Sequence, residues 1–201
     1  MRREQGLQRL RRVFPLQQRI GALAPPARAA YIAILSQWVR GGRGRAPKAP
    51  ATVLQTLAAM DAIVIGHDGI GCYPFSARNT GIAVLLNGRQ VYAMCAIDAL
   101  AIPALMRQAG QIATTCAVCG RPLTLGTDSE GNATEMTTQA EVVWHDRQTH
   151  LACCGESLCP NIRFVCRSCA TAPDAMRFTV VDAAAIGGAF FAFQRELLTA
   201  S

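Results

Sequence analysis

At 201 residues the chain is long enough to bury one sizeable core, so it does not depend on cross-links in the way that a mini-protein does. Hydrophobic residues make up 51% of it and charged residues 16%, which is the composition of a globular protein. The longest apolar stretch, residues 183–193, is far shorter than the roughly 20 residues that a membrane-spanning helix requires, so we expect no membrane partner.

The net charge of +7 is concentrated at one end of the chain. Residues 1–50 hold eleven of the twenty Lys and Arg residues and a single acid, Glu4, while the remainder is net acidic. Such a basic segment can contact nucleic acid or another acidic surface. We favour a solvated helix face followed by an Arg-Gly loop, and we do not expect nucleic acid among the partners.

Nine cysteines raise the question of disulfides. A disulfide framework is typical of exported chains, whereas the first 23 residues contain many arginines, no apolar signal segment and no small-residue cleavage site. We therefore expect a cytoplasmic protein with reduced thiols. In that compartment so many cysteines more often indicate metal or thiolate chemistry.

The first third of the chain predicts helices followed by a hairpin. Apolar residues recur at helical spacing up to Leu23, with an interruption at Pro15. Two further helices and two short strands around an Asp-Gly turn are predicted at residues 29–39, 52–60, 62–66 and 71–75. Helices followed by a hairpin suggest a winged-helix-like subdomain over residues 1–75.

The remaining residues, 76–201, predict a mixed sheet with packing helices. The clearest hairpin joins residues 82–86 to 90–94 through Asn87-Gly88-Arg89, and a helix follows from Cys95 to Met106 with a kink or restart at Pro103. Three strands are then expected at residues 111–115, 122–126 and 141–144, followed by a cysteine-rich loop at 150–169. The chain should end with a strand at 177–181 and a terminal helix at 183–198, with Asp182 as the helix N-cap and with Gly187-Gly188 permitting close packing. The fold class predicted is α+β.

Cys95 and Asp98 stand three residues apart at the start of a predicted helix. That spacing places both side chains on one face of the helix, and a helix N-terminus lowers the pKa of a cysteine. Cys95 is therefore a candidate thiolate beside an acid. From spacing alone, such a pair more often reflects packing and complementarity to the helix dipole.

The surrounding residues carry a resemblance to a known family. The run of residues 91–105, VYAMCAIDALAIPAL, resembles the active-site segment of the organomercurial (alkylmercury) lyases, the MerB family. The similarity continues through residues 116–123, CAVCGRPL, and reappears at Cys159 and the Ile-Arg-Phe of residues 162–164. It covers roughly residues 60–200, with a looser match before them.

The resemblance implies a lyase that cleaves carbon–mercury bonds by protonolysis. Cys95 and Cys159 match the two catalytic, mercury-binding cysteines of the family, and Asp98 matches its catalytic aspartate. Thiolates are the ligands that select soft metals, and a nearby acid can protonate the carbon. The reaction would need no cofactor beyond exogenous thiols, which would remove Hg(II), and mercuric reductase is a possible acceptor.

Four other cysteines form two Cys-x-x-Cys pairs, Cys116 with Cys119 and Cys166 with Cys169. Together they match the ligand set of a tetrahedral structural zinc site, although 46 residues separate the pairs. Cys119 departs from the family pattern, which has a non-cysteine residue there. Extra thiols that shuttle mercury, or ordinary buried cysteines, are the alternatives.

Smaller groups stay open to more than one interpretation. The vicinal Cys153 and Cys154 could receive a soft metal or simply be buried, and His145 and His150 could be ligands, although a lone loop histidine usually is not one. Cys72 is interpreted as a core residue.

Two hypotheses of different classes follow. The first is the lyase described above. The second is a non-catalytic metal-binding or regulatory protein of the same fold, suggested by the extra Cys-x-x-Cys pairs and the basic first 50 residues.

Overall fold

A computed structural model gives the fold, and we describe residues 2–41, 48–134, 140–145, 153–170 and 175–200 of it. Most of the predicted Arg-Gly loop, and His150, lie outside these residues. The described helices are α1 (Arg2–Val13), α2 (Leu16–Gly21), α3 (Pro25–Gly41), α4 (Ala51–Ala59), α5 (Ala96–Met106), α6 (Cys154–Ser157), α7 (Val180–Phe190) and α8 (Ala192–Thr199), with 3-10 turns η2 (Cys159–Asn161) and η3 (Arg167–Cys169).

Two antiparallel sheets form within the described residues. The strands of the larger sheet are β1 (Ile63–Gly66), β2 (Gly69–Cys72), β3 (Phe75–Ser76), β4 (Ala83–Leu86), β5 (Arg89–Ala93), β6 (Gly110–Thr115) and β7 (Pro122–Thr127). Their order is β1-β2-β3-β5-β4-β6-β7, and the smaller sheet has the order β10-β8-β9 with strands β8 (Ala140–His145), β9 (Ile162–Cys166) and β10 (Ala175–Thr179). The predicted α+β class is confirmed.

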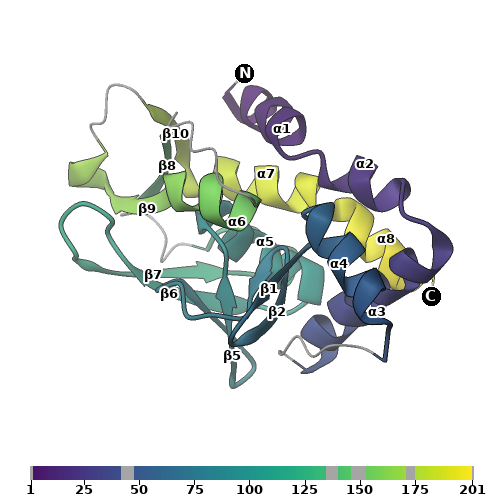
Figure 1. The fold of residues 1–201 in the computed structure, drawn as a ribbon. Coiled ribbons are helices and arrows are strands. Elements are labelled where there is room, and N and C mark those ends of the chain that lie inside the picture. The colour runs from purple at the N-terminus through teal and green to yellow at the C-terminus, as the bar shows by residue number, and fades with distance from the viewer. Residues whose placement is uncertain (1, 42–47, 135–139, 146–152, 171–174, 201) are drawn as a thin grey trace.

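Figure 1 shows how the layers are arranged. The small sheet lies over the β6–β7 end of the large sheet, and α2 to α4 gather with α8 on the opposite side of the molecule. Helix α1 packs on α7 and reaches β10 of the small sheet. The buried hydrophobic side chains of the described residues form one continuous core cluster. Among the described helices none is both long and apolar enough to cross a membrane.

The N-terminal helices share this core with the sheet. The ring of Trp38 in α3 stacks on Phe75 of β3 with centroids 5.2 Å apart, and its indole N–H donates to the carbonyl of Ile70 at 3.0 Å. The predicted break at Pro15 and the two further helices are present as α1, α2, α3 and α4. The domain boundary near residue 75 and the winged-helix-like character remain predictions, and β3 pairs directly with β5 across that boundary.

Helix α5 is the central element of the fold. All eleven of its residues are buried, including Pro103, and the helix continues through that proline as a single element. Packing on all sides offsets the lost backbone hydrogen bond. Gly187 of α7 lets the two helices approach closely, because a Cβ there would lie 2.7 Å from the carbonyl oxygen of Ile97; Gly188 faces open space.

Several sequence-based expectations near the C-terminus were wrong. Asp182 is not the N-cap of α7: Thr179 is, and its hydroxyl accepts from the Asp182 N–H at 3.0 Å. This cap starts the helix three residues earlier than predicted, at Val180, and the strand ends at Thr179, two residues before its predicted end. The predicted terminal helix is divided at Phe191 into α7 and α8, and the predicted cysteine-rich loop contains strand β9, whose alternation is obscured because Phe164, Val165 and Cys166 are all buried.

Candidate active site

Cys95 begins the site, because it connects the large sheet to the central helix. It follows β5 as the N-cap residue of α5, in extended conformation, and its sulfur accepts from the backbone N–H of Asp98 at 3.5 Å. Cysteine is an unusual cap, but it satisfies one of the N–H groups that a helix start leaves unpaired. Asp98 occupies the first turn of α5, where the helix dipole favours a negative charge. The side chains of both residues are buried.

Cys159 comes from a different part of the fold, at the start of η2 directly after α6. Two buried side chains from the N-terminal half fix α6: Asp61 accepts from the backbone N–H of Cys154 at 3.0 Å, and the Tyr73 hydroxyl accepts from the N–H of Gly155 at 2.8 Å. Tyr73 in turn donates to Asp61 at 2.8 Å. Contacts over 93 and 82 residues of sequence therefore position the segment that carries Cys159.

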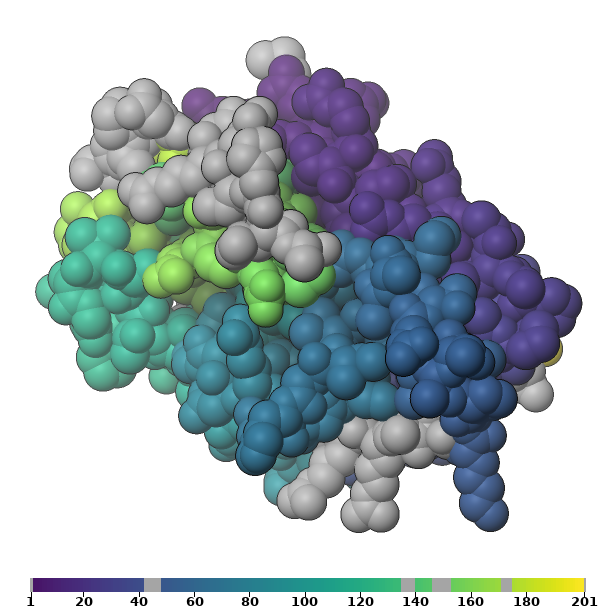
Figure 2. Space-filling view, in the orientation of Figure 1, coloured from purple at the N-terminus to yellow at the C-terminus, as the bar shows by residue number. Residues whose placement is uncertain are grey.

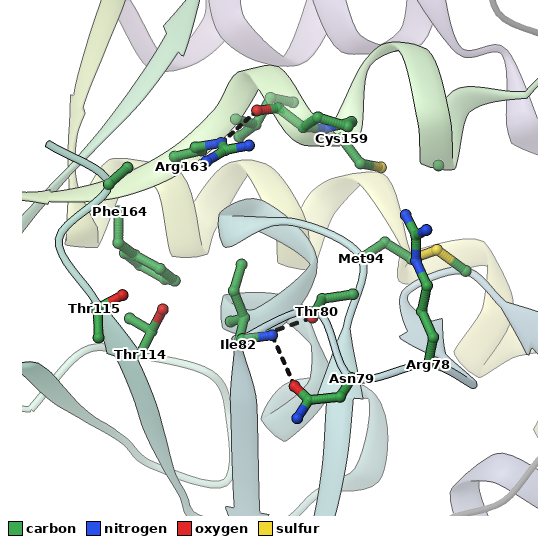
Figure 3. Close-up of a pocket in the computed structure, with 15 residues that line it drawn as sticks. Arg78, Asn79, Thr80, Ile82, Met94, Thr114, Thr115, Cys159, Arg163 and Phe164 are labelled. Carbon is green, nitrogen blue, oxygen red and sulfur yellow. Dashed lines mark hydrogen bonds between the residues drawn. The ribbon is translucent and has the colours of Figure 1, made fainter. Parts of the chain in front are cut away.

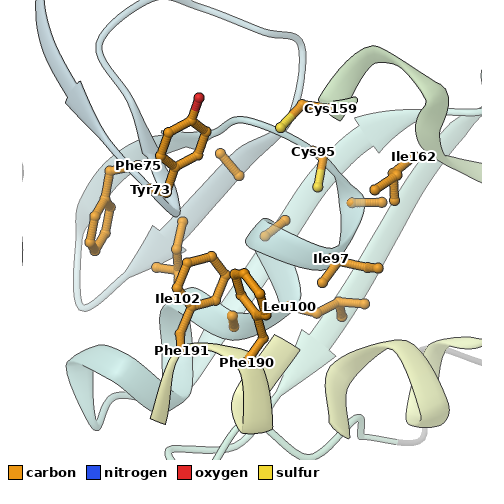
Figure 4. Close-up of a cluster of buried hydrophobic side chains, with 14 of the residues drawn as sticks. Tyr73, Phe75, Cys95, Ile97, Leu100, Ile102, Cys159, Ile162, Phe190 and Phe191 are labelled. Atoms are coloured by element: carbon orange, nitrogen blue, oxygen red, sulfur yellow. The ribbon is translucent and has the colours of Figure 1, made fainter. Parts of the chain in front are cut away.

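Cys95, Asp98 and Cys159 converge as a buried group that we call the Cys-Asp-Cys trio. Their ligand atoms, two sulfurs and a carboxylate oxygen, all lie within 4.8 Å of one another. The Cys159 thiol points at Asp98, with 3.7 Å between its sulfur and Oδ2. Figure 4 shows the two cysteines next to each other at the edge of the apolar cluster. The structure thus brings together the three residues that the sequence singled out.

Cys154 adds a third sulfur that the sequence left ambiguous. Its sulfur lies 3.9 Å from that of Cys159, and it is buried. Neighbouring Cys153 is only half-buried and is the N-cap residue of α6, without a side-chain capping bond. Cys154, Asp61 and Tyr73 are the site residues that sequence reasoning did not assign, since no local pattern links them to Cys159.

Burial sets the protonation of the trio. It raises the pKa of Asp98 from 3.8 to about 7, although hydrogen bonds from Cys95 and Cys159 act in the opposite direction. Burial also raises the pKa of Cys95 well above its usual value, while the hydrogen bond with Cys154 is the largest cause of the raised pKa of Cys159. Burial thus opposes the effect of the helix N-terminus on the pKa of Cys95, and the assignment of Cys95 as a candidate thiolate stays a prediction.

Residues of the trio line two cavities. A small internal one lies against Cys95, Asp98 and Cys159 and is lined otherwise by mostly apolar side chains, among them Phe14 and Phe190. A larger cavity of about 360 Å³ is bounded by Cys159 and β9 on one side and by residues 78–82 and β6 on the other. Figure 3 shows Cys159 on one wall of this cavity, with Met94 and Arg78 across from it.

The face in Figure 2 includes the segment that carries Cys159. There the green residues around 154–166 meet the blue and teal strands, beside the purple N-terminal helices. Cys159 itself is only 4% exposed, and it lines the larger cavity.

A second group of cysteines lies where the two sheets meet. Cys116 and Cys119 occupy the loop between β6 and β7, whereas Cys166 ends β9 and Cys169 lies in η3. Their four sulfurs also lie within 4.8 Å of one another. We call them the four-cysteine cluster. The two Cys-x-x-Cys pairs, 46 residues apart in sequence, are therefore adjacent in the fold.

The remaining candidates are separate from both groups. Cys72 is a fully buried core residue of β2, as expected. Of the described histidines, His67 lies exposed in the turn between β1 and β2 and His145 ends β8, and neither belongs to a metal-ligand group within the described residues.

Comparisons with known proteins identify a family and a similar fold. The model of the family "MerB: Alkylmercury lyase" matches residues 75–182, a span that contains the trio and the four-cysteine cluster. The crystal structure of the mercury-bound form of MerB2 is similar in fold, with a TM-score of 0.66 and 19% sequence identity over 89% of this chain and 96% of that one. No curated protein matches the chain.

Proposed function

The chain belongs to the alkylmercury lyase family and is an enzyme of that class, and we propose that its Cys-Asp-Cys trio cleaves the carbon–mercury bond of organomercurials into a hydrocarbon and Hg(II). The observation that carries the proposal is the burial of two thiols and a carboxyl group with their ligand atoms within 4.8 Å. Sulfur is the ligand that a soft metal prefers, and the carboxyl group supplies a proton relay at the same point.

The first step is capture of the substrate cation R–Hg⁺ by Cys159. This thiol lines the larger cavity, and its sulfur lies 3.7 Å from Asp98 Oδ2. As the sulfur–mercury bond forms, the thiol proton moves to the Asp98 carboxylate. A carboxyl group with a pKa of about 7 suits this exchange, because it can take up and give back a proton near neutral pH.

The second step brings in Cys95 and breaks the carbon–mercury bond. Cys95 releases its proton and binds mercury, and the N–H of Asp98 stabilises the new thiolate. Two sulfur ligands raise the electron density on the attached carbon. Asp98 then protonates that carbon with the electron pair of the carbon–mercury bond, so that R–H leaves and Hg(II) stays on two thiolates. Two thiol protons are consumed: one ends in the hydrocarbon and one in solvent.

Product release needs another thiol. The Cys154 sulfur, 3.9 Å from that of Cys159, is close enough to serve as a third ligand while Hg(II) is exchanged. We propose low-molecular-weight thiols as the exogenous acceptors, mercuric reductase as a subsequent partner, and a reducing compartment, the cytoplasm, as the location. The reaction itself uses no resident cofactor in this scheme.

The organic group is proposed to lie in the larger cavity of about 360 Å³, where Ile82, Met94 and Phe164 give apolar surface near Cys159. The small internal cavity beside Cys95 and Asp98 has a volume of only about 10 Å³, which is too small for an aryl or alkyl group. Exclusion of water there favours protonation of carbon by Asp98 over side reactions.

The test is to incubate pure protein with an arylmercurial and excess thiol and to measure the arene. Wild type should release it catalytically, and Cys95→Ala and Cys159→Ala should lose at least a thousandfold in rate. Cys153→Ser is the matched control, because it removes a half-buried thiol outside the trio and should retain activity. Absence of arene from wild type, or unchanged rates in both alanine variants, contradicts the proposal.

The second hypothesis, a non-catalytic metal-binding or regulatory protein of this fold, is not favoured, because the family match includes the residues of the trio. We propose that the winged-helix-like front end serves as scaffolding for the site. Asp61 and Tyr73, which hold α6, and Leu10 and Phe14, which line the small cavity, come from this region.

A further inference from the structure

Four sulfurs converge where the three-stranded sheet meets the seven-stranded sheet, and the trio makes no use of them. We infer that Cys116, Cys119, Cys166 and Cys169 bind one structural zinc ion that fastens the two sheets together at the rim of the larger cavity. The site is separate from the trio, since Cys166 lies at the far end of β9 from Cys159 and that strand is about 13 Å long.

The spacing of the sulfurs fits a tetrahedral ion. Zinc–thiolate bonds of about 2.3 Å in a tetrahedron place each pair of sulfurs about 3.8 Å apart. The sulfurs of Cys119 and Cys166 lie 3.7 Å apart, and all four lie within 4.8 Å of one another. This separation is far longer than a disulfide bond of about 2.0 Å, so the four thiols are not cross-linked and are free to bind an ion.

The loop between β6 and β7 has the backbone that such a site needs. Gly120 directly follows Cys119 with a φ of +72°, and its N–H donates to the Cys116 carbonyl at 2.9 Å to close the turn. Glycine adopts this conformation without steric cost. The N–H of Cys166 donates to the Cys116 sulfur at 3.3 Å, which is the contact that stabilises a metal-bound thiolate.

The ligand chemistry points to zinc held for structure and not to a second reactive centre. Every ligand is sulfur, and within the described part of the chain the group contains no carboxyl group or histidine for proton transfer, in contrast to the trio. Four protein ligands also complete a tetrahedron and leave no position for a substrate. Sites with four thiolates select zinc or iron over the harder cations, and two Cys-x-x-Cys pairs are typical of structural zinc.

The place of the ion explains what it would do. The described strands of the two sheets are not hydrogen-bonded in one ladder, and the backbone bond from Ala117 N–H to the Phe164 carbonyl, 3.0 Å long, is a direct link between them. Ala117 lies between two of the ligands, Phe164 lies two residues before a third, and both line the larger cavity.

An ion here would therefore fix the width of that cavity and the end of β9, the strand that begins directly after η2 and Cys159. This consequence rests on the proposed function of the trio, whereas the binding of zinc does not.

Metal analysis of the full-length protein tests the inference. Wild type purified without chelator should contain about one zinc per chain. Addition of Co(II) to the reduced, metal-free protein should give the intense visible bands and sulfur-to-cobalt charge transfer of a tetrahedral thiolate site. Cys119→Ser is the variant of choice because Cys119 is exposed, so the change leaves the core intact. After dialysis against a chelator, the zinc content of this variant should be at least tenfold lower than that of wild type.

Matched variants separate this site from the trio. Cys95→Ala and Cys153→Ser should keep the zinc content and the cobalt spectrum of wild type, whatever their lyase activity. The inference is overturned if wild type contains no zinc and gives no cobalt–thiolate spectrum, if the bound metal is iron, or if Cys119→Ser retains zinc as firmly as wild type. A chain that binds zinc in this way but releases no arene would uphold the site and reject the proposed reaction.

Discussion

The molecule contains two cysteine groups that differ in what surrounds the sulfurs. The Cys-Asp-Cys trio is fully buried, contains a carboxyl group and faces an internal cavity. The four-cysteine cluster contains only sulfur, has one exposed member and lies where two sheets meet. The difference teaches that sulfur alone does not define a reactive site. An incomplete ligand set with a titratable acid favours exchange and proton transfer, while a complete tetrahedral set favours retention.

Replacement of Asp98 should give the largest difference between the two cysteine groups, because it should affect the rate of the reaction and not zinc binding. Asp98→Asn keeps the shape of the side chain but removes the proton relay, so kcat/KM should fall by about 10²–10⁴-fold while mercury and zinc binding persist. In wild type, kcat/KM should rise with pH through about 7, because Asp98 must be ionised to accept the thiol proton. A pH–rate profile of both proteins checks this, and an unchanged inflection in the variant would assign the titration to another group.

Stability should respond in opposite directions in the two groups. The Asp98 carboxyl ionises near pH 7 in the folded chain and near 3.8 when unfolded, so the folded state binds more protons between these values. The free energy of unfolding should therefore fall as pH rises from 4 to 7. At pH 8, Asp98→Asn should be more stable than wild type by up to about 4 kcal/mol, and the two should converge near pH 4.

Cys119→Ser provides the contrast, because loss of the proposed ion should lower Tm at pH 8, by roughly 2–4 °C for each kcal/mol lost. The difference from wild type should shrink near pH 4, where protonation of the thiolates releases the ion from wild type as well. Chemical denaturation and thermal melts at the two pH values measure both effects. An Asp98→Asn variant less stable than wild type at pH 8 would mean that the carboxylate is well solvated or paired, contrary to its burial.

The smallest effect is expected at a residue that only positions the trio. Tyr73→Phe removes the hydroxyl that donates to Asp61 and accepts from the Gly155 N–H, at 2.8 Å in both cases. An unpaired buried N–H costs about 1–3 kcal/mol of stability. Looser placement of α6 should lower kcat/KM several-fold, with the zinc content unchanged. A fall as large as that of Asp98→Asn would instead give Tyr73 a direct part in the chemistry.

Local features of the fold and site could be predicted from the sequence, whereas long-range features could not. The Cys95–Asp98 pair was predictable because both residues belong to one helix turn, and the Asn-Gly hairpin before them has an equally local signal. The effect of burial on the pKa of Cys95 could not be predicted locally, because the elements that bury this thiol lie far away in sequence. Asp61 and Tyr73 could not be found, since their hydrogen bonds to α6 arise only in the folded chain.

The two Cys-x-x-Cys pairs also show that local patterns are easier to predict than long-range contacts. The spacing within each pair is a local pattern and was recognised. The proximity of the two pairs depends on strand β9, which lies within a segment that was predicted to be a loop. The N-cap of α7 was predicted at the wrong residue for a related reason. Thr179 and Asp182 are both residue types that begin helices, and only the folded backbone shows that Thr179 is the cap.

A single-turnover experiment tests the central claim most directly. Wild-type protein is mixed with one equivalent of an arylmercurial in the absence of added thiol, and arene and protein-bound mercury are both measured after gel filtration. The account predicts about one arene per chain with Hg(II) retained by the protein, the same yield from Cys119→Ser, and none from Cys95→Ala. An equal arene yield from Cys95→Ala, or mercury bound to wild type with its aryl group still attached, would contradict it.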